Sequence, residues 1–390
     1  MKNLALLYPD VLVPESPAFR DTGDFLSRNT PDQPVLLFSR NRLQRTAYRF
    51  QELFPGEVSY AVKANPECMI LSGLWDAGIR SFDVASLAEI IQVRQLLPNS
   101  ELHFNNPIRT RSDTERAYRD FGVHSFVIDD LAGLKGLEGI ADPQTEITVR
   151  FKLNDHKAAY DFGSKFGATV DEAAILCRLA GYTGSRISLT FHPGSQCTDP
   201  WEYDRYIRAA AGICAASGVR IHRLNVGGGF PIAYPGTQIP DTENFVETIS
   251  HSVATHFPAH RPDLLCEPGR AMVAESASLL AQVIHVRDGG DVFVNDGVYG
   301  SFQEHSLMPH GHPVRTWRGN AQITGETRPA QIFGPTCDPI DRLSTSIDVP
   351  LDVRPGDYLE FGLLGAYGSA TATHFNGFTP AGYQAVEFGF

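Results

Sequence analysis

The chain has 390 residues, of which 42% are hydrophobic and 20% charged, so it can bury one or two large cores. Its 33 basic against 45 acidic residues give a net charge of −12, which disfavours nucleic acid and anionic membrane as nonspecific partners. No apolar run reaches the roughly eighteen residues that a membrane span needs, and the start, MKNLALLYPDVLVPESP, does not resemble a secretion signal. We therefore expect a cytoplasmic protein.

From about residue 33 to residue 266, short apolar runs alternate with segments of helical period. VLLF, EVSYAVK and SFDVAS each precede a longer amphipathic stretch, and ELHF, SFVID, ITVRFK, RISLTFH, IHRLNVGGG and DLLCEPG continue the alternation. Roughly eight such units predict an α/β fold, an eight-stranded (β/α) TIM-like barrel, over residues 28–268. Reactive groups of a barrel lie at the carboxyl ends of its strands. The polar residues and glycines at or just past these ends are Lys63, Arg150, His192, Gly227, Gly228, Gly229 and Glu267.

After about residue 270 the pattern changes to alternating strands separated by Gly, Pro and Asp turns. Examples are SLLAQVIHVRD, DVFVND, AQIFGP, DYLEFG and ATATHFNGF. This predicts a C-terminal antiparallel β domain, a sandwich or barrel, formed by residues 269–390 and, as we assign them, residues 1–27. No internal repeat or low-complexity linker separates the two parts, so we expect them to pack together.

Taken one by one, the candidate motifs are ambiguous. NVGGGFP lets backbone amides approach an anion, but a simple turn explains it nearly as well, and it matches neither a P-loop nor GxGxxG. In EPGRAMV, Arg270 suits a phosphate, although a surface salt bridge is the commoner role. In FHPGSQC, His192 and Ser195 follow a strand, where a structural histidine is the more frequent case.

Cysteine and histidine patterns predict no metal site. The six cysteines contain no CxxC pair, so neither a disulfide framework nor a zinc ribbon is indicated, and most should be small buried hydrophobes. The loop HSLMPHGH holds His305, His310 and His312, but their irregular spacing favours a solvated loop over a metal centre. Cys337 in GPTCDPID, taken alone, reads as an inert thiol.

Together, YAVKAN, FDVAS, HPGSQC, NVGGGFP, EPGRAMV, NDGVYGSF, GPTCDPID and GAYGSA resemble, in this order and along nearly the whole chain, one enzyme family. These are the fold-type III decarboxylases that use pyridoxal 5′-phosphate, the ornithine, lysine, arginine and diaminopimelate decarboxylases. The resemblance implies an amino-terminal eight-stranded barrel, a carboxyl-terminal β domain and a head-to-tail homodimer with active sites between subunits. It also implies a lyase of the kind used in polyamine biosynthesis.

The resemblance assigns Lys63 as the amine that links covalently to the cofactor's aldehyde. Glu267 resembles the carboxylate that keeps the pyridine nitrogen protonated, so that the ring can take up the electron pair left by carbon dioxide. Racemases of the same fold place an arginine against this nitrogen, so Glu267 favours decarboxylation. His192 resembles the imidazole that stacks on the ring.

Further cofactor contacts follow from the same resemblance. The residues that match phosphate-holding positions are Ser195, Gly227, Gly228, Gly229, Gly269, Arg270 and Tyr367. Asp83, Glu89 and Arg150 match positions in the supporting polar network, where we assign an orienting role.

The partner subunit supplies the rest of the site in this family. By analogy, Cys337 reprotonates the α-carbon and Asp338 contacts the distal amine of the substrate. The analogy also suggests an ion pair between Lys165 and Asp341 across the dimer, with a surface pair as the alternative.

One departure limits the substrate assignment. Eukaryote-like ornithine decarboxylases carry a second aspartate for the distal amine nine residues after the tyrosine that matches Tyr299, and counting from Tyr299 reaches Met308. Glu304, or a histidine of the same loop, is a candidate replacement, and we include Tyr299 and Glu304 as substrate contacts. Arg315 and Arg318 are too loosely placed to clamp the second carboxylate of diaminopimelate. A basic amino acid such as ornithine, lysine or arginine is therefore the expected substrate.

Other functions stay open at this point. Within the enzyme class they are a decarboxylase of a specialised or D-amino acid and a fold-type III racemase. Outside it, a catalytically silent homologue could bind a partner as antizyme inhibitors do, although the presence of Lys63, Glu267, Arg270 and Cys337 disfavours this.

Overall fold

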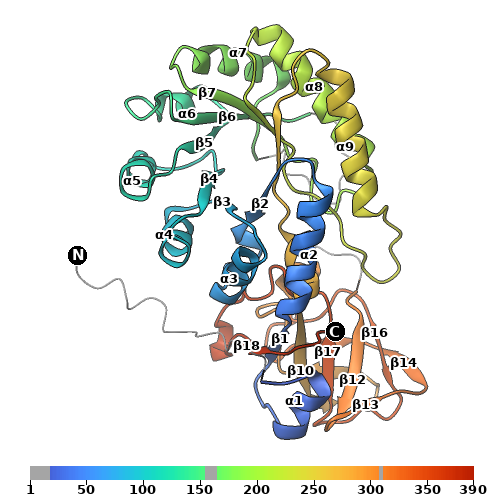
Figure 1. Ribbon diagram of the computed structural model, residues 1–390. Coiled ribbons are helices and arrows are strands. Elements are labelled where there is room, and N and C mark those ends of the chain that lie inside the picture. The colour runs from blue at the N-terminus through green and yellow to red at the C-terminus, as the bar shows by residue number, and fades with distance from the viewer. Residues whose placement is uncertain (1–17, 154–164, 307–310) are drawn as a thin grey trace.

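The computed structural model of the protein describes residues 18–153, 165–306 and 311–390. A barrel with its surrounding helices lies at one end and a β-rich domain at the other (Figure 1). No helix in the described part of the chain is long and apolar enough to cross a membrane.

The barrel domain contains eight parallel strands that close on themselves. The strands, in the order in which they pair, are β2 (Glu57–Ala61), β3 (Ser81–Val84), β4 (Glu101–Phe104), β5 (Ser125–Ile128), β6 (Glu146–Arg150), β7 (Arg186–Thr190), β8 (Arg223–Asn225) and β9 (Asp263–Cys266). The helices of this part of the chain are α2 (Arg40–Leu53), α3 (Cys68–Asp76), α4 (Leu87–Leu96), α5 (Arg111–Phe121), α6 (Leu131–Lys135), α7 (Val170–Gly181), α8 (Trp201–Ser217) and α9 (Thr242–His256). The predicted barrel is confirmed.

Local sequence explains why strands give way to helices at defined residues. All four residues of β5 are buried, as expected for a parallel strand covered on both faces. Side-chain caps start several of the helices: the Ser86 side chain accepts a hydrogen bond from the Glu89 N–H at the start of α4, and Thr169 and Glu172 form a capping box at the start of α7. These side chains fix the residues at which α4 and α7 begin.

The second domain is built mainly from antiparallel pairs. Its main sheet has the order β13-β12-β17-β10-β1-β18, with β11 and β15 attached beside β10, and β14 and β16 form a separate pair. The strands are β1 (Val35–Phe38), β10 (Ala277–Val286), β11 (Val292–Val294), β12 (Val314–Arg318), β13 (Ala321–Ile323), β14 (Thr327–Ala330), β15 (Ile332–Phe333), β16 (Ile347–Pro350), β17 (Tyr358–Phe361) and β18 (Gly382–Ala385). Short helices α1 (Thr22–Arg28) and α10 (Arg270–Val273) flank this region. The predicted β domain is therefore present, with two parallel pairs, β1–β18 and β11–β15.

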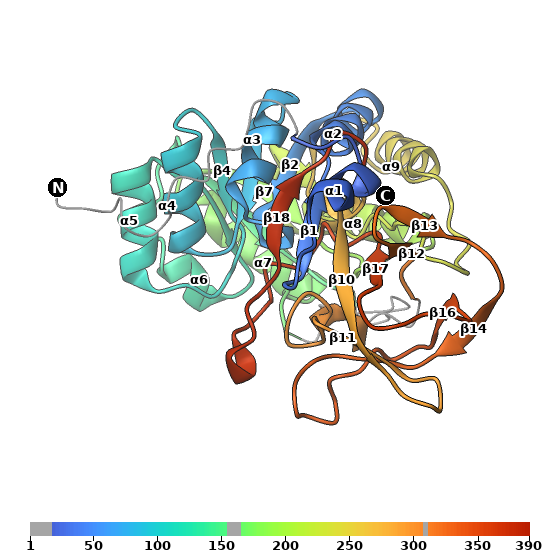
Figure 2. The same cartoon turned by 90° about the horizontal axis from the view of Figure 1, so that it is seen from below.

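The run VLLF is a correction to the sequence-based assignment. We expected it to open the barrel, but as β1 it lies between β10 and β18 in the second domain (Figure 2). Val35 opposes Leu280 of β10, while Leu36 and Leu37 are fully buried in the clusters around that sheet. The barrel strands begin only at Glu57, so the predicted domain boundary at residue 28 falls too early. A four-residue apolar strand carries no local signal for the sheet it joins.

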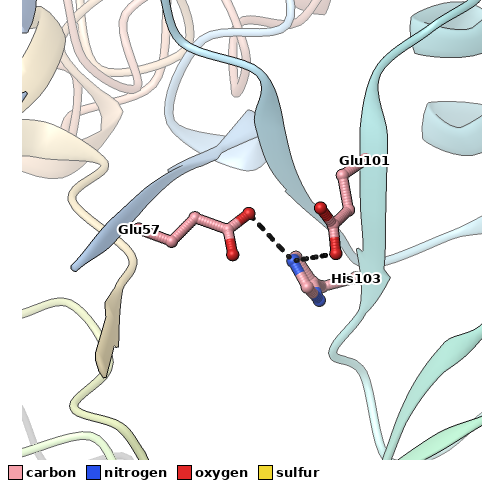
Figure 3. Close-up of side chains that lie close together, drawn as sticks. All are labelled: Glu57, Glu101 and His103. Carbon is pink, nitrogen blue, oxygen red and sulfur yellow. Dashed lines mark ion pairs between the residues drawn. The ribbon is translucent and has the colours of Figure 1, made fainter. Parts of the chain in front are cut away.

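Charged side chains close the amino-terminal end of the barrel. His103 Nε2 lies 3.7 Å from Glu57 and 3.9 Å from Glu101 (Figure 3). Among the described residues, these three are the group whose ligand atoms could converge on a metal ion. The guanidinium of Arg223 already balances the two carboxylates, because it lies 2.8 Å from Glu57 and 3.8 Å from Glu101. Burial tends to raise the pKa of Glu57, but His103 and Arg223 outweigh it and lower that pKa to about 2. We interpret the group as a structural ion-pair network.

Candidate active site

A cavity of about 260 Å³ opens at the carboxyl ends of the barrel strands. It brings together residues that are far apart in the sequence. The residues expected at the cofactor that line it are Lys63, Asp83, Arg150, His192, Ser195, Gly228, Gly229, Glu267, Gly269, Arg270 and Tyr367. Lys165 also faces this space.

Lys63 follows β2 on a single 3₁₀ turn, Val62–Ala64. Val62 and Ala64 are fully buried, whereas Lys63 is exposed and lines the cavity. A hydrogen bond next to the turn stabilises it: the Tyr60 hydroxyl donates to the Asn65 carbonyl at 3.0 Å. The packing of its neighbours therefore presents the lysine amine to the cavity without placing its side chain in the core.

Glu267 follows β9 and faces the same cavity. Its Oε1 accepts a hydrogen bond from Asn225 Nδ2 at 2.5 Å and a short one from Asn105 Nδ2. Burial, followed by the nearby Asp83 carboxylate, raises the pKa of Glu267 to about 7, and the bond from Asn225 opposes this rise. We did not predict Asn105 or Asn225, although both follow the strand-end rule that identified Glu267.

Arg150 and Asp83 form the charged surroundings of Lys63. Arg150 is the last residue of β6, and its guanidinium lies 5.3 Å from the centre of the Phe166 ring. Burial lowers the pKa of Arg150 against the opposing influence of Glu267. Burial also raises the pKa of Asp83, an effect that the positive charge of Lys63 opposes. Both residues line the cavity, so an orienting role is sterically possible for each.

Glu89 lies behind the cavity rather than on its lining. Its carboxylate accepts a hydrogen bond from the Ala85 N–H at 2.6 Å and so closes the loop between β3 and α4. Burial raises the pKa of Glu89 to about 7. In this position Glu89 orders the loop that follows Asp83.

His192 and the glycine turn form one wall. His192 Nδ1 accepts a hydrogen bond from the Gly194 N–H at 3.1 Å. Burial, then the charges of Lys63 and Arg150, lower the pKa of His192 well below its usual value, so the ring is neutral. A Cβ on Gly228 would lie 2.7 Å from the Glu267 carbonyl oxygen and 3.2 Å from His192 Nε2. A larger residue than glycine at position 228 would therefore collide with the Glu267 backbone.

Gly227 has a different place from its two neighbours. It adopts a φ of +68°, and a Cβ there would meet the Phe191 carbonyl oxygen at 2.2 Å. Its N–H donates to Asn225 Oδ1 at 2.8 Å, and it is not among the residues that line the cavity. A direct phosphate contact stays a prediction for Gly228 and Gly229, while Gly227 shapes the turn.

Arg270 lines the cavity and makes contacts to three side chains. Its guanidinium donates to the Tyr234 hydroxyl at 3.0 Å and to Glu304 at 2.5 Å, and it lies 5.0 Å from the centre of the Tyr367 ring. Tyr367 has a φ of +58°, an uncommon conformation for a residue other than glycine, and its N–H donates to the Ala64 carbonyl. Glu304, expected at the substrate, therefore pairs with the residue expected at the phosphate. We did not predict Tyr234, for which the sequence offers no motif.

Cys337, Asp338 and Tyr299 form a second group away from the cavity lining. Asp338 accepts a hydrogen bond from the Tyr299 hydroxyl at 2.6 Å, and the exposed Cys337 lies 3.5 Å from Asn376 Oδ1. The Tyr299 ring stacks on Phe375 at 4.2 Å. Residues expected from the partner subunit thus share one surface of this chain.

Asp341 is held by hydrogen bonds within its own chain, and its expected pair with Lys165 across a dimer stays a prediction. Asp341 is 2% exposed and accepts hydrogen bonds from the Val298 N–H at 2.8 Å and from the Thr336 N–H and hydroxyl at 3.0 and 2.7 Å. These three bonds fix the position of the Asp341 carboxylate against its own loop.

Replacing Asp341 with alanine should therefore lower the free energy of unfolding by about 3 kcal/mol, because two buried backbone donors lose their acceptor. Asp348→Ala, at an exposed position of β16, is the control and should change stability little. Urea unfolding measures both. Unchanged stability of Asp341→Ala together with a loss of dimer would instead favour the intersubunit pair.

The expectation of a solvated histidine loop fails for two of its residues, whereas the two loosely placed arginines lie away from the cavity, as expected. His305 and His312 are 1% and 9% exposed, so the expectation of a solvated loop is wrong for them, and burial lowers the pKa of His312 to about 3. Met308 and His310 lie outside the described residues. Arg318 pairs with Asp352 and Asp357, and Arg315 lies over the Phe390 ring, so neither reaches the cavity.

Cysteine burial follows the expectation only in part. Cys177, Cys197 and Cys266 are buried, Cys68 and Cys214 are half-buried, and Cys337 is exposed.

The mouth of the barrel thus brings a lysine, a buried carboxylate, a neutral histidine and a guanidinium into one cavity. The family described as pyridoxal-dependent decarboxylase, pyridoxal binding domain, matches residues 40–274. The chain belongs to this family, which confirms the resemblance seen in the sequence.

Known proteins are similar over most of the chain. The lysine/ornithine decarboxylase of Selenomonas ruminantium is 30% identical over 88% of this chain and 87% of its own length. Ornithine decarboxylase 2 of Drosophila melanogaster is 31% identical over 89% of this chain and 90% of its own length. Among solved structures, the arginine decarboxylase of Paramecium bursaria Chlorella virus superposes with a TM-score of 0.83 at 26% identity, covering 93% of this chain and 98% of that one.

Proposed function

We propose that this enzyme uses pyridoxal 5′-phosphate to decarboxylate a basic amino acid, such as ornithine or lysine, to a diamine with release of carbon dioxide. The observation that carries the proposal is the convergence of Lys63, Glu267 and Arg270 on one cavity in a chain of the decarboxylase family. The named relatives are decarboxylases of lysine, ornithine and arginine, which supports a basic substrate.

The residues of the cavity have separate tasks in this proposal. When bound, the cofactor supplies the electron sink for the pair left by the departing carboxylate. Lys63 provides the amine that holds the cofactor aldehyde, and Glu267 holds a proton at the ring nitrogen. His192, neutral and confined by Gly228, offers a flat ring to pack against the cofactor.

The phosphate end requires donors and positive charge. Arg270 supplies a guanidinium, Tyr367 a hydroxyl, and Ser195 with Gly228 and Gly229 the remaining donors. Glu304 already contacts Arg270, which makes it a poor match for a free acceptor of the distal substrate amine unless it turns away from the guanidinium. Asp338 and Tyr299 therefore remain the better candidates for that amine.

We also propose a homodimer with shared active sites. Cys337 and Asp338 lie outside the cavity of their own chain, and the exposed apolar side chains of Ile340, Phe375 and Phe378 are in the same two segments as these residues and Asn376. A self-complementary contact would bury this surface and carry Cys337 to the cavity of the other subunit. A cytoplasmic location stays a prediction.

Mixing inactive subunits tests the shared site. Lys63→Ala and Cys337→Ala should each be almost inactive, while co-expression of the two should restore about a quarter of wild-type activity, because half of the dimers then carry one intact site. The control is a mixture of the two separately purified variants under conditions in which the dimers do not exchange subunits, and it should stay inactive. Absence of recovery despite proven heterodimers would contradict a site shared between subunits.

A substrate panel tests the reaction itself. Purified protein with pyridoxal 5′-phosphate is incubated with L- and D-ornithine, lysine, arginine and diaminopimelate, and amine products are identified by mass spectrometry. We expect a diamine or agmatine from at least one L-amino acid. Inversion without carbon dioxide release would indicate a racemase, and a lack of both reaction and covalent cofactor would favour the silent binding protein.

A further inference from the structure

One side chain connects the glycine turn beside the cavity with Glu267. Asn225, the last residue of β8, is 5% exposed. Its Oδ1 accepts a hydrogen bond from the Gly227 N–H at 2.8 Å, and its Nδ2 donates to Glu267 Oε1 at 2.5 Å. The same carboxamide thus contacts the glycine turn on one side and the carboxylate for the ring nitrogen on the other.

The backbone strengthens this link. The Glu267 N–H donates to the Gly227 carbonyl at 2.8 Å, and the Val226 N–H donates to the Leu265 carbonyl at 2.8 Å. Asn225, Gly227 and Glu267 are therefore joined by three hydrogen bonds, two from the side chain and one from the backbone. A displacement of the glycine turn must move or break a contact to Glu267.

Asn105 completes the arrangement from the opposite wall of the barrel. It directly follows β4, and its Nδ2 donates to the same Oε1 of Glu267. Both bonds go to one oxygen, so they orient the carboxylate without using Oε2. They also favour the anion, which burial and Asp83 disfavour.

The two contacts of residue 225 require a side chain that accepts one hydrogen bond and donates another, as an amide does. A carboxylate at position 225 could still accept from the Gly227 N–H, but it could not donate to Glu267 and would put a second negative charge against it. An aliphatic side chain would leave the Gly227 N–H without its acceptor and would take one of the two amide donors away from Glu267. Only a group that donates and accepts at once serves both contacts.

We propose that Asn225, assisted by Asn105, is a positioning residue that favours the ionised form of Glu267 and ties its orientation to the glycine turn of the phosphate site. The inference rests on the proposed function, since Glu267 and the turn serve the cofactor there. It assigns the two asparagines to the tuning of the ring nitrogen rather than to substrate binding.

The test compares Asn225→Asp and Asn105→Ala with wild type. Pyridoxal 5′-phosphate labelled with ¹⁵N at the ring is added, its dissociation constant is measured by absorbance titration, and the ¹⁵N chemical shift reports protonation of the ring nitrogen. We expect Asn225→Asp to bind the cofactor about tenfold more weakly, the loss of one charge-assisted hydrogen bond. Its ¹⁵N signal should move towards the unprotonated value, whereas Asn105→Ala should shift the signal less.

A matched control exists in the second domain. Asn295 also accepts a backbone N–H through Oδ1, from Gln282 at 2.8 Å, and donates through Nδ2, to the Asp32 carbonyl at 2.9 Å. Asn295→Asp should leave cofactor affinity and the ¹⁵N signal unchanged. If Asn225→Asp retains the wild-type dissociation constant and signal, the inference is wrong. If wild-type protein itself binds no cofactor, the proposed function fails instead.

Thermal unfolding of the cofactor-free variants separates positioning from folding. Asn225→Asp should melt below wild type, because it places a second carboxylate against Glu267, but it should stay folded at the assay temperature, because the backbone bonds between β8 and β9 remain. A variant that fails to fold is replaced by Asn225→Gln, which retains both a donor and an acceptor and should keep a ring-nitrogen signal nearer to wild type. A Gln variant with the same shift as Asn225→Asp would contradict the role of the donor.

Discussion

Lys63→Ala should abolish decarboxylation while leaving the fold intact. The lysine side chain is exposed to the cavity and its neighbours Val62 and Ala64 carry the packing, so its removal opens no void in the core. Loss of a covalent catalytic group typically lowers turnover by roughly 10⁴-fold. Carbon dioxide release from the preferred amino acid measures this effect.

The same variant has a chemical signature. Borohydride reduction of the wild-type enzyme should fix the cofactor on a peptide that contains Lys63, and the variant should lack this labelled peptide. Lys135→Ala, an exposed lysine at the end of α6, is the control and should keep both activity and labelling. Undiminished turnover of Lys63→Ala would contradict the mechanism.

Glu267→Gln should lower kcat by about 10²- to 10³-fold, the usual effect of removing one preorganised electrostatic group. Glutamine has the same shape and its carbonyl can still accept from Asn105 and Asn225, but it cannot hold a proton at the ring nitrogen as a carboxylate does. The cofactor would then stabilise the electron pair poorly. Steady-state kinetics should show the loss mainly in kcat, with the covalent link to Lys63 preserved.

A buried glutamate elsewhere gives the comparison. Glu202 on α8 is 8% exposed and pairs with Arg205 at 2.9 Å, away from the cavity lining. Glu202→Gln should change kcat little even if stability falls. An equal loss of kcat in Glu267→Gln and Glu202→Gln would indicate that Glu267 affects activity through folding.

The strand and helix alternation was sufficient to predict the barrel, because parallel strands and their covering helices leave a local hydrophobic pattern. The strand-end rule and the ordered motifs placed Lys63, His192 and Glu267 on the cavity correctly. Roles at the cofactor stay predictions until a ligand is bound. Asn105 and Asn225 were missed, although each stands at a strand end. Asn225 is the first residue of NVGGGFP, but only the glycines of that motif were given a role, and Asn105 lies in none of the quoted motifs.

Other features depend on contacts between distant segments. β1 joins β10 and β18, some 240 and 350 residues further along the chain, and nothing in four apolar residues specifies those partners. The pairing of Arg270 with Glu304 and the burial of Asp341 under its own loop likewise arise from how the β domain folds back on itself.

By itself, the sequence determined the barrel, the attached β domain, the family and most of the expected cofactor residues that meet at the cavity, because local periodicity and contiguous motifs specify each of these. Only the tertiary structure decided which sheet takes β1, which amides hold Glu267 and which carboxylate meets Arg270. The physical reason is that barrel closure and sheet pairing set these distances, and hydrogen bonds and burial act over a few ångströms of space regardless of separation along the chain.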